Sequence, residues 1–270
     1  MIKKILRSSW LILVLLFMYL PILILAVYSF TDTATIGTGG NFSLNNYKTL
    51  FTSPELLNMI GGTFILAIGS SIVATILGTI GAIGSFYSKK VMKNAVSIAN
   101  QIPVVNADVV TGFSICVLLI VVLGIKKDTY IPLVAGHVVM SAPFVYLSVI
   151  PKLKQMNNNL YEAALDLGAS PSQALFKVVI PQIVPGIASG FIMAITLSLD
   201  DYFIATYTKP STFDTISTYV FNATKGSQTE LKTALWALST LIFILVVVLV
   251  LVSNLITSKK EVGKLGKEDV

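Results

Sequence analysis

The chain alternates between long apolar stretches with little or no charge and short segments that carry most of the charged residues. Each apolar stretch is long enough for the roughly 20 residues that a membrane-spanning helix needs. The pattern therefore predicts an all-α integral membrane fold with six transmembrane helices in one domain, residues 1–258, followed by a charged tail, residues 259–270. The predicted spans cover approximately residues 8–31, 59–87, 100–125, 130–151, 183–203 and 232–257.

The composition supports a bilayer rather than a water-soluble core. The 270 residues are 54% hydrophobic and 12% charged, with a mean hydropathy of +0.82, whereas a soluble domain carries about twice that charged fraction. The only cysteine, Cys116, lies inside an apolar stretch, where it fits a small packing residue better than a disulfide or metal ligand. No cofactor or metal site is expected. The first apolar stretch is longer than a signal-peptide core, so we expect it to be retained.

The lysine and arginine residues indicate the orientation of the spans, because cytoplasmic loops carry an excess of them. If the N-terminus is cytoplasmic, 13 of the 19 basic residues fall on the cytoplasmic side and 6 outside. Both termini are therefore expected in the cytoplasm. The net charge of +6 indicates attraction to anionic lipid rather than binding of nucleic acid.

Small residues recur at every fourth position in the second predicted span. Such a face allows two helices to approach closely in lipid. It predicts close packing within the chain or a seam with another membrane subunit. The residues of this stripe are Ser70, Ala74, Gly78 and Ala82.

The longest loop predicted on the cytoplasmic side, residues 156–181, contains signals for two short helices that meet at a bend. Asn159 can cap the first helix, with Glu162 three residues later completing a capping box. Gly168 is placed to end that helix in a left-handed turn. The segment Ser170–Gln173 can form a second capping box, with proline at the first helical position.

The first of these two helices is predicted to be amphipathic. Leu160, Ala164 and Leu167 share one side, and Glu162 and Asp166, four residues apart, share another. A helix of this kind can lie on lipid or fit a groove on a partner protein. Two carboxylates facing an anionic leaflet are unfavourable, so the charges favour a protein partner.

The same loop resembles the EAA loop of ABC-importer permeases, whose pattern is E-A-A-x3-G-x9-I-x-L-P. The chain matches it with Glu162–Ala164, then Gly168, then Val178–Pro181. Its two departures, Val for Ile and Ile for Leu, are both conservative. Because the loop also lies between the fourth and fifth predicted spans, the resemblance covers nearly the whole chain.

The resemblance implies a type I ABC importer permease (MetI-like) fold in a bacterial cytoplasmic (inner) membrane. In that family the loop contains the coupling helix, which docks on a separate ATPase subunit. The chain lacks the G-x-x-x-x-G-K-[ST] motif, and the resemblance implies that it is a transport subunit rather than an enzyme. The implied partners are a homologous second permease, two ATPase copies and an extracytoplasmic binding protein. The residues that the resemblance assigns to coupling are Glu162, Ala163, Ala164, Asp166, Gly168 and Pro181.

Acidic residues inside the predicted spans indicate a path for a cation. Asp108 lies in the third predicted span, and Asp200 and Asp201 lie near the outer end of the fifth. Ionised carboxylates at such depths are costly and usually face a cavity or a partner. Carboxylates beside an aromatic ring such as Tyr202 suit a cationic cargo, through ion pairing and cation–π contact.

Each of these residues also has a purely structural interpretation. Asp200 and Asp201 can form a solvated helix end. Asp108 can accept a hydrogen bond from Asn106 or from a neighbouring helix. His137, the only histidine, fits a packed and satisfied residue in the fourth predicted span.

The segment Ser198–Phe203 resembles the S-L-D-D-[FY] segment of spermidine/putrescine permease subunits, and Asn106–Val110 resembles their P-D-I-V segment, with alanine in place of proline. The resemblance implies polyamine as the cargo. Oxyanions such as phosphate or sulfate would instead want arginine or helix N-termini. Ferric iron, thiosulfate and another organic cation stay open as alternatives.

Two other classes of function stay open. A stand-alone channel or an ion-driven carrier would transport without an ATPase. A membrane enzyme is disfavoured, because the few polar groups form no Ser/His/Asp or metal-ligand constellation on matched spans.

Overall fold

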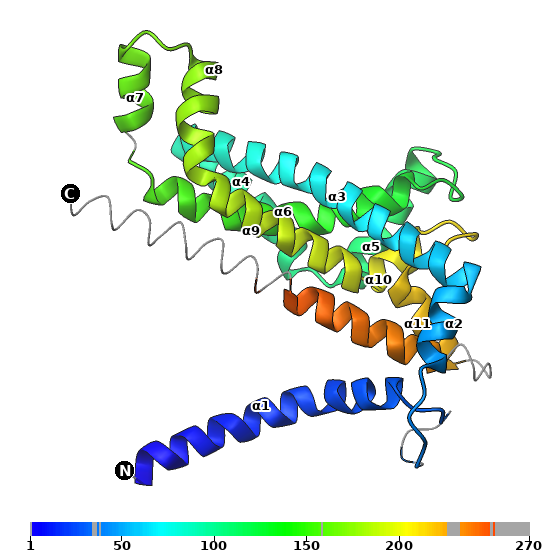
Figure 1. The fold of residues 1–270 in the computed structure, drawn as a ribbon. Coiled ribbons are helices and arrows are strands. Elements are labelled where there is room, and N and C mark those ends of the chain that lie inside the picture. The colour runs from blue at the N-terminus through cyan, green and yellow to red at the C-terminus, as the bar shows by residue number, and fades with distance from the viewer. Residues whose placement is uncertain are drawn as a thin grey trace. The chain divides into compact units, whose positions relative to one another are not determined.

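The computed structural model describes residues 2–33, 37, 39–157, 159–225, 233–248 and 251, and these are mainly helical (Figure 1). This confirms the all-α prediction. Two π-helical segments are present: Val117–Val122 continues the helix Asp108–Cys116, and Leu175–Val179 joins the helix Pro171–Ala174 to Ile180–Asp200. The helices are α1 (Ile2–Ser29), α2 (Asn45–Thr52), α3 (Pro54–Tyr87), α4 (Lys90–Val105), α5 (Asp108–Cys116), α6 (Ile131–Gln155), α7 (Asn159–Asp166), α8 (Pro171–Ala174), α9 (Ile180–Asp200), α10 (Phe203–Thr208) and α11 (Ile216–Lys225), with a further helix at Thr233–Val248.

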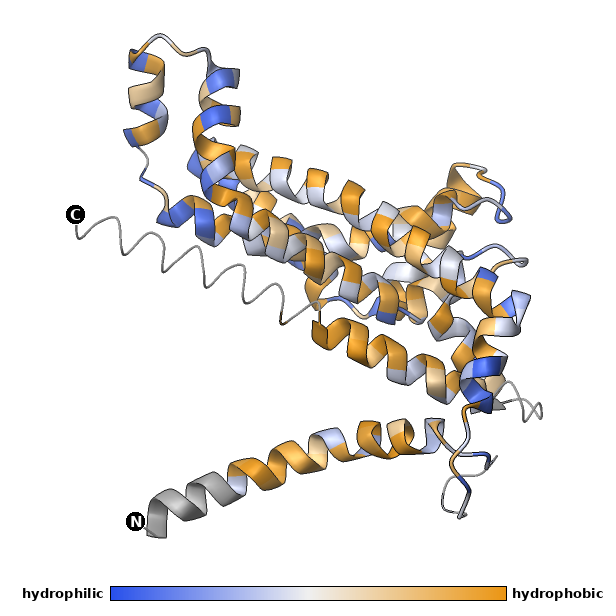
Figure 2. Cartoon of the chain, viewed as in Figure 1, coloured by the Kyte–Doolittle hydropathy of each residue, from blue (hydrophilic) through white to orange (hydrophobic). Residues whose placement is uncertain are grey.

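Four helices in the described part are long and apolar enough to cross a membrane: Trp10–Ser29 within α1, α3, α6 and the continuous helix Pro171–Asp200. Figure 2 shows apolar residues along most of their length. Helices α4 and α5 with its π-helical extension count as a fifth span if the two arms, bent by 105°, are taken together. Thr233–Val248 is a shorter apolar helix. The rest of the last predicted span and the predicted tail, except residue 251, lie outside the described residues.

The chain divides into two compact units, of which the first contains residues 1–58 and 219–248. In this unit the start of α2 is anchored to the end of α1. The side-chain amide nitrogen of Asn46 donates to the carbonyl oxygen of Ser29 at 3.0 Å. The Tyr47 hydroxyl forms a hydrogen bond with the Ser29 hydroxyl at 2.9 Å. These hydrogen bonds fix the first loop to the end of its preceding helix.

In the second unit, which contains residues 59–218, the central contact is the antiparallel pair α6 and α9. Glycines on α9 allow the two backbones to approach closely. A Cβ atom added to Gly190 would lie 3.0 Å from the Cα of Val145, and one added to Gly186 would lie 2.9 Å from the carbonyl oxygen of Ser148. Close approach through small residues is how helices associate in lipid, where no hydrophobic effect drives them together.

The stripe of small residues on α3 packs within the chain. Gly78 lies against α6, where an added Cβ would meet the Ala142 carbonyl oxygen at 2.7 Å. Ser70, Ala74 and Ala82 are almost completely buried. The structure therefore supports intrachain packing, the first of the two interpretations of this stripe.

Replacing Gly78 by alanine should destabilise the protein by about 1–3 kcal/mol, the usual penalty for overpacking a close contact. Thermal unfolding in detergent would show this as a lower Tm. Gly69 lies on the same helix, where an added Cβ meets nothing within 4 Å, so Gly69→Ala is the matched control. Equal melting temperatures for the two variants would contradict close packing of α3 on α6.

Helices α4 and α5 are separated by a break at Asn106 and Ala107, whose backbones are extended. The break turns α5 toward α10. A Cβ added to Gly112 would lie 3.0 Å from the Cα of Ile204, and the rings of Phe113 and Tyr207 lie 6.0 Å apart. These contacts place α5 and α10 side by side.

Candidate functional site

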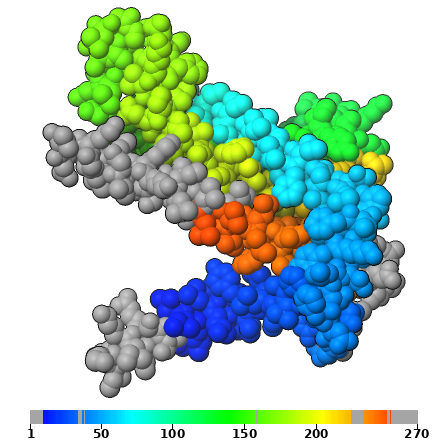
Figure 3. Space-filling model, viewed as in Figure 1, coloured from blue at the N-terminus to red at the C-terminus, as the bar shows by residue number. Residues whose placement is uncertain are grey.

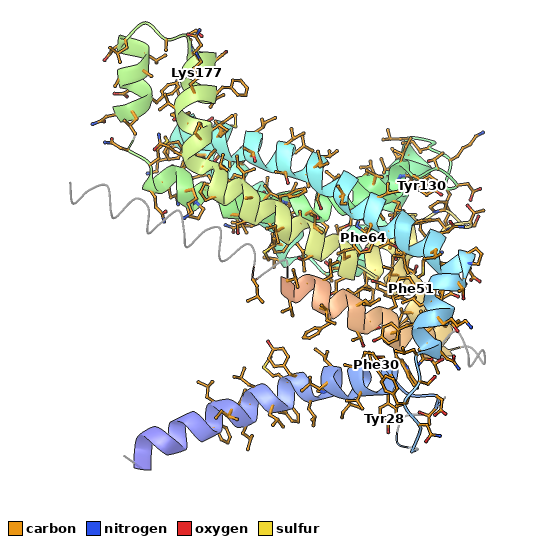
Figure 4. The ribbon with its side chains drawn as sticks, viewed as in Figure 1. Tyr28, Phe30, Phe51, Phe64, Tyr130 and Lys177 are labelled. Carbon is orange, nitrogen blue, oxygen red and sulfur yellow. The ribbon has the colours of Figure 1, made fainter. Side chains whose placement is uncertain are left out.

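A helical hairpin formed by α7 and the start of the helix Pro171–Asp200 projects from the end of the α6–α9 pair (Figure 1). The space-filling view shows it as a separate lobe (Figure 3), and Lys177 lies on its second arm (Figure 4). The hairpin coincides with the loop predicted at residues 156–181. Its surface is more polar than that of the long helices (Figure 2).

The bend of the hairpin has the geometry predicted from its glycine. Gly168 has a φ of 85°, in the left-handed region that L-amino acids with a side chain rarely adopt. Its N–H donates to the Leu165 carbonyl oxygen at 2.9 Å, and the Ala169 N–H donates to that of Ala164 at 3.0 Å. This pair of bonds is a Schellman motif, which satisfies carbonyl groups at the end of α7.

The second predicted capping box is also confirmed. The Ser170 N–H donates to the side-chain oxygen of Gln173 at 3.0 Å, and the Gln173 N–H donates to the Ser170 hydroxyl at 3.3 Å. The helix that starts here is longer than predicted, because it continues to Asp200. Its π-helical turn ends at Val179, two residues before Pro181, whose ring would clash with the carbonyl four residues earlier in a regular α-helix.

The predicted first capping box is wrong in register. Helix α7 begins at Asn159, so this residue is helical, and its N–H donates to the side-chain oxygen of Asn157 at 3.0 Å. Residues 157–159 are all asparagine, and each is an equally good cap. Sequence alone could not choose among them.

Helix α7 packs on the bundle through one face and leaves the other exposed. The Tyr161 ring lies 5.1 Å from that of Tyr87, and it packs against the core cluster beneath. On the exposed face, Leu160 and Leu167 show 42% and 89% of their surface. The inward residue is thus Tyr161, and Leu160 and Leu167 on the predicted apolar side are exposed.

The predicted coupling residues lie at different depths on this hairpin. Glu162, Ala163 and Asp166 are exposed on α7, and Ala164 is half-buried. Pro181 is exposed too, but it lies at the start of α9, beyond the π-helical turn. The exposed surface therefore combines two carboxylates with apolar side chains, a composition that suits a protein partner.

The three predicted path aspartates lie near one another. Asp108 is the first residue of α5, and Asp200 is the last residue of α9. Both are exposed, and both interact electrostatically with Asp201. Asp108 begins α5, and Asp201 accepts from backbone N–H groups in the first turn of α10, so two of these carboxylates lie at helix N-termini, where negative charge is stabilised.

Asp201 differs from its neighbour Asp200 in burial and bonding. It is only 7% exposed, and its two carboxylate oxygens accept from the backbone N–H groups of Ile204 at 3.1 Å and Ala205 at 2.7 Å. Asp201 therefore caps α10 and ends α9. The solvated helix end, which the sequence allowed for both residues, describes Asp200 alone.

The remaining polar residues near the cluster have defined places. Tyr202 is half-buried, and its ring lies 5.2 Å from that of Phe203 in an edge-to-face arrangement. The side-chain nitrogen of Asn106 donates to the Thr111 hydroxyl at 3.0 Å. The bond joins the break between α4 and α5 to α5 itself, and it engages the Asn106 amide that the sequence offered as a donor to Asp108.

His137 connects to the acid cluster, which the sequence did not indicate. It is completely buried on α6, and its Nδ1 atom lies 2.8 Å from the Ser198 hydroxyl on α9. Its Nε2 atom lies 3.7 Å from a carboxylate oxygen of Asp201. The position of Ser198, three residues before Asp201 on one helix face, was the available signal for part of this arrangement.

Comparison with known proteins gives one consistent family. Residues 74–260 match the family described as binding-protein-dependent transport system inner membrane component. The chain is 28% identical to the spermidine/putrescine transport system permease protein PotC of Escherichia coli (strain K12), covering 98% of this chain and 99% of the relative. It is 31% identical to the putrescine transport system permease protein PotI of the same organism, covering 87% of this chain and 86% of that relative.

Solved structures agree on the fold. A bacterial ABC transporter involved in the import of the acidic polysaccharide alginate matches with a TM-score of 0.71 at 19% identity, covering 96% of this chain and 98% of the other. An amino acid ABC transporter matches with a TM-score of 0.57 at 15% identity, covering 79% and 97%. The predicted fold of an ABC importer permease is thereby confirmed.

Proposed function

Because the chain belongs to the family of binding-protein-dependent transport system inner membrane components, we propose that it forms part of the path through which an ATP-driven importer moves spermidine or putrescine. As a member of this family, the chain is a transport subunit, and the ATPase is a separate subunit. The observation that supports a polyamine as the cargo is the acid cluster of Asp108, Asp200 and Asp201. Relatives that match nearly the full length of this chain are named as polyamine permeases.

The chemistry of the cluster supports an amine cargo. Asp108 and Asp200 are exposed carboxylates that can each accept charge-assisted hydrogen bonds from an ammonium group. The rings of Tyr202, Phe203 and Tyr207 follow directly in the chain, and such rings attract cations and pack against methylene groups. A polyamine combines ammonium groups with methylene spacers, so it matches both features.

The hairpin supports a coupling role. Glu162, Ala163 and Asp166 form an exposed surface with Leu167, and we propose that it docks on the ATPase. Ala164, Gly168 and Pro181 then serve to hold the helix, the bend and the following arm in place. The proposed assembly also contains a homologous second permease, two ATPase copies and an extracytoplasmic polyamine-binding protein.

The coupling role proposed for the hairpin also implies where the protein lies and on which side of the membrane its termini are. We propose a bacterial cytoplasmic membrane with both termini in the cytoplasm, which places the hairpin on the side where an ATPase subunit has access to ATP. The excess of basic residues in the predicted cytoplasmic segments supports this orientation.

The test of cargo is uptake into vesicles by the complete transporter, purified with its partner subunits. Radiolabelled putrescine and spermidine should accumulate in an ATP-dependent manner. Ferric iron, thiosulfate and a monovalent organic cation serve as the panel of alternatives. Uptake of one of these in place of polyamines would reassign the cargo, and uptake by this chain without the ATPase would indicate a channel or carrier.

A further inference from the structure

A chain of buried polar groups leads from the packed helices to the acid cluster. The Ser70 hydroxyl on α3 lies 3.4 Å from that of Ser198 on α9, and the Ser198 hydroxyl lies 2.8 Å from His137 Nδ1 on α6. His137 Nε2 then faces Asp201 at 3.7 Å. We call these four residues the His137 relay. Its members come from α3, α6, α9 and the α9–α10 break.

The free end of the relay is the Nε2 atom of His137. It has no hydrogen-bond partner within the described ranges, and the side chains of His137 and Asp201 are 0% and 3% exposed. A buried polar group without a partner is unfavourable. The carboxylate of Asp201 faces this atom at 3.7 Å, and a movement of roughly half an ångström would bring the pair to the upper limit of a hydrogen bond.

The hydrogen-bond roles follow from the neighbours of the imidazole ring. The Ser198 hydroxyl can donate to Nδ1, which leaves Nε2 as the protonated nitrogen. A carboxylate oxygen accepts only, so an Nε2–H aimed at Asp201 is the complementary arrangement. His137 can thus hold the carboxylate from the side opposite to the backbone N–H groups of α10.

Asp201 is not placed to touch a cargo directly, because both of its oxygens accept from α10 and it is buried. Its charge still acts on Asp108 and Asp200, since charges interact strongly where water is excluded. A third negative charge behind two exposed ones favours a cargo with more positive charges. That preference depends on where the third charge is held.

We propose that His137 is a positioning residue of the acid cluster, which holds the Asp201 carboxylate behind Asp108 and Asp200 and thereby sets the preference of the transporter for a triamine over a diamine. This inference rests on the proposed function as a polyamine permease. Its distinguishing feature is that the effect passes through Asp201 rather than through packing of α6 on α9.

Two substitutions test the two nitrogen atoms of the His137 imidazole ring separately. His137→Gln places an amide nitrogen near the position of Nε2, so it can still donate to Asp201. His137→Asn is shorter, so it can still pair with Ser198 but does not reach Asp201. We expect the glutamine variant to keep the wild-type ratio of spermidine to putrescine uptake, and the asparagine variant to lower that ratio about five- to tenfold. This is less than the direct loss of one hydrogen bond to a charged group would give, because the change reaches the cargo only through Asp201.

The control is Ser141→Ala. Ser141 lies one turn further along α6 and is also completely buried, with a hydroxyl that has no partner among the described residues. This variant should leave the uptake ratio unchanged. A lower ratio in Ser141→Ala would mean that the ratio reports packing of α6, and would overturn the proposal.

The decisive measurement repeats the His137→Asn change in an Asp201→Asn background of the complete transporter. If His137 acts through Asp201, the second substitution should change the ratio no further. An additive loss, or a lower ratio in the glutamine variant than in the asparagine variant, would overturn the proposal.

Uptake of both amines by the wild-type transporter is measured alongside. A wild-type transporter that carries no polyamine would contradict the proposed function instead of the role of His137. Should His137→Asn fail to assemble, His137→Gln takes its place: by itself it must keep the wild-type ratio, and in the Asp201→Asn background it must leave the ratio of Asp201→Asn unchanged.

Discussion

Replacing Asp200 by asparagine should lower polyamine uptake by about tenfold or more, whereas the same change at Asp201 should have a smaller effect. Asp200 is exposed at the end of α9, where its carboxylate can contact an ammonium group. Loss of a hydrogen bond between charged groups removes about 1.5–3 kcal/mol, and 1.36 kcal/mol corresponds to a factor of ten. Asp201 instead accepts from α10 with both oxygens and does not contact the cargo, and asparagine keeps one of these two acceptors.

The initial rate of uptake into vesicles, at several concentrations of each amine, measures both variants. Asp201→Ala should lower the Tm as well, because the cap contributes about 0.5–2 kcal/mol. Asp214→Asn is a matched control, since Asp214 is paired with Lys209 at 2.9 Å and lies outside the acid cluster. A larger loss of uptake in Asp201→Asn than in Asp200→Asn would show that we have exchanged their roles.

Replacing Gly168 by valine should uncouple ATP hydrolysis from transport without preventing membrane insertion. A Cβ added at this position meets nothing within 4 Å, so space is not the obstacle. The obstacle is the φ of 85°, which is unfavourable by about 1–2 kcal/mol for an ordinary residue and more for a β-branched one. The Schellman motif should therefore open, and α7 should lose its fixed orientation toward the ATPase.

The order of a substitution series tests this cause. Asparagine tolerates the left-handed region better than alanine, and alanine better than valine. Binding-protein-stimulated ATPase activity should therefore fall in the order Gly168→Asn, Gly168→Ala, Gly168→Val. Glu162→Gln should lower the same activity by removing a charged contact while leaving the bend intact. Wild-type stimulation in both Gly168→Val and Glu162→Gln would remove the hairpin from the coupling mechanism.

Local features of the hairpin could be predicted because their causes lie within a few residues. The left-handed glycine at 168 and the capping box Ser170–Gln173 each depend on backbone groups that adjacent side chains satisfy. The cap at Asn159 was wrong because three consecutive asparagines offer the same chemistry. The arm after Ser170 was predicted too short, because apolar periodicity does not reveal that a π-helical turn can carry a helix past Pro181.

The sequence by itself determined the helical membrane fold, the hairpin and the presence of acids near the ends of two spans, since apolar length, turn chemistry and charge are properties of the chain. Only the tertiary structure decided that Asp200 is exposed while Asp201 is a buried cap, because that depends on where α10 turns back against α5. It also decided that His137 on α6 meets Ser198 and Asp201. Such contacts join residues more than 60 positions apart, and close helix packing alone sets which of them meet.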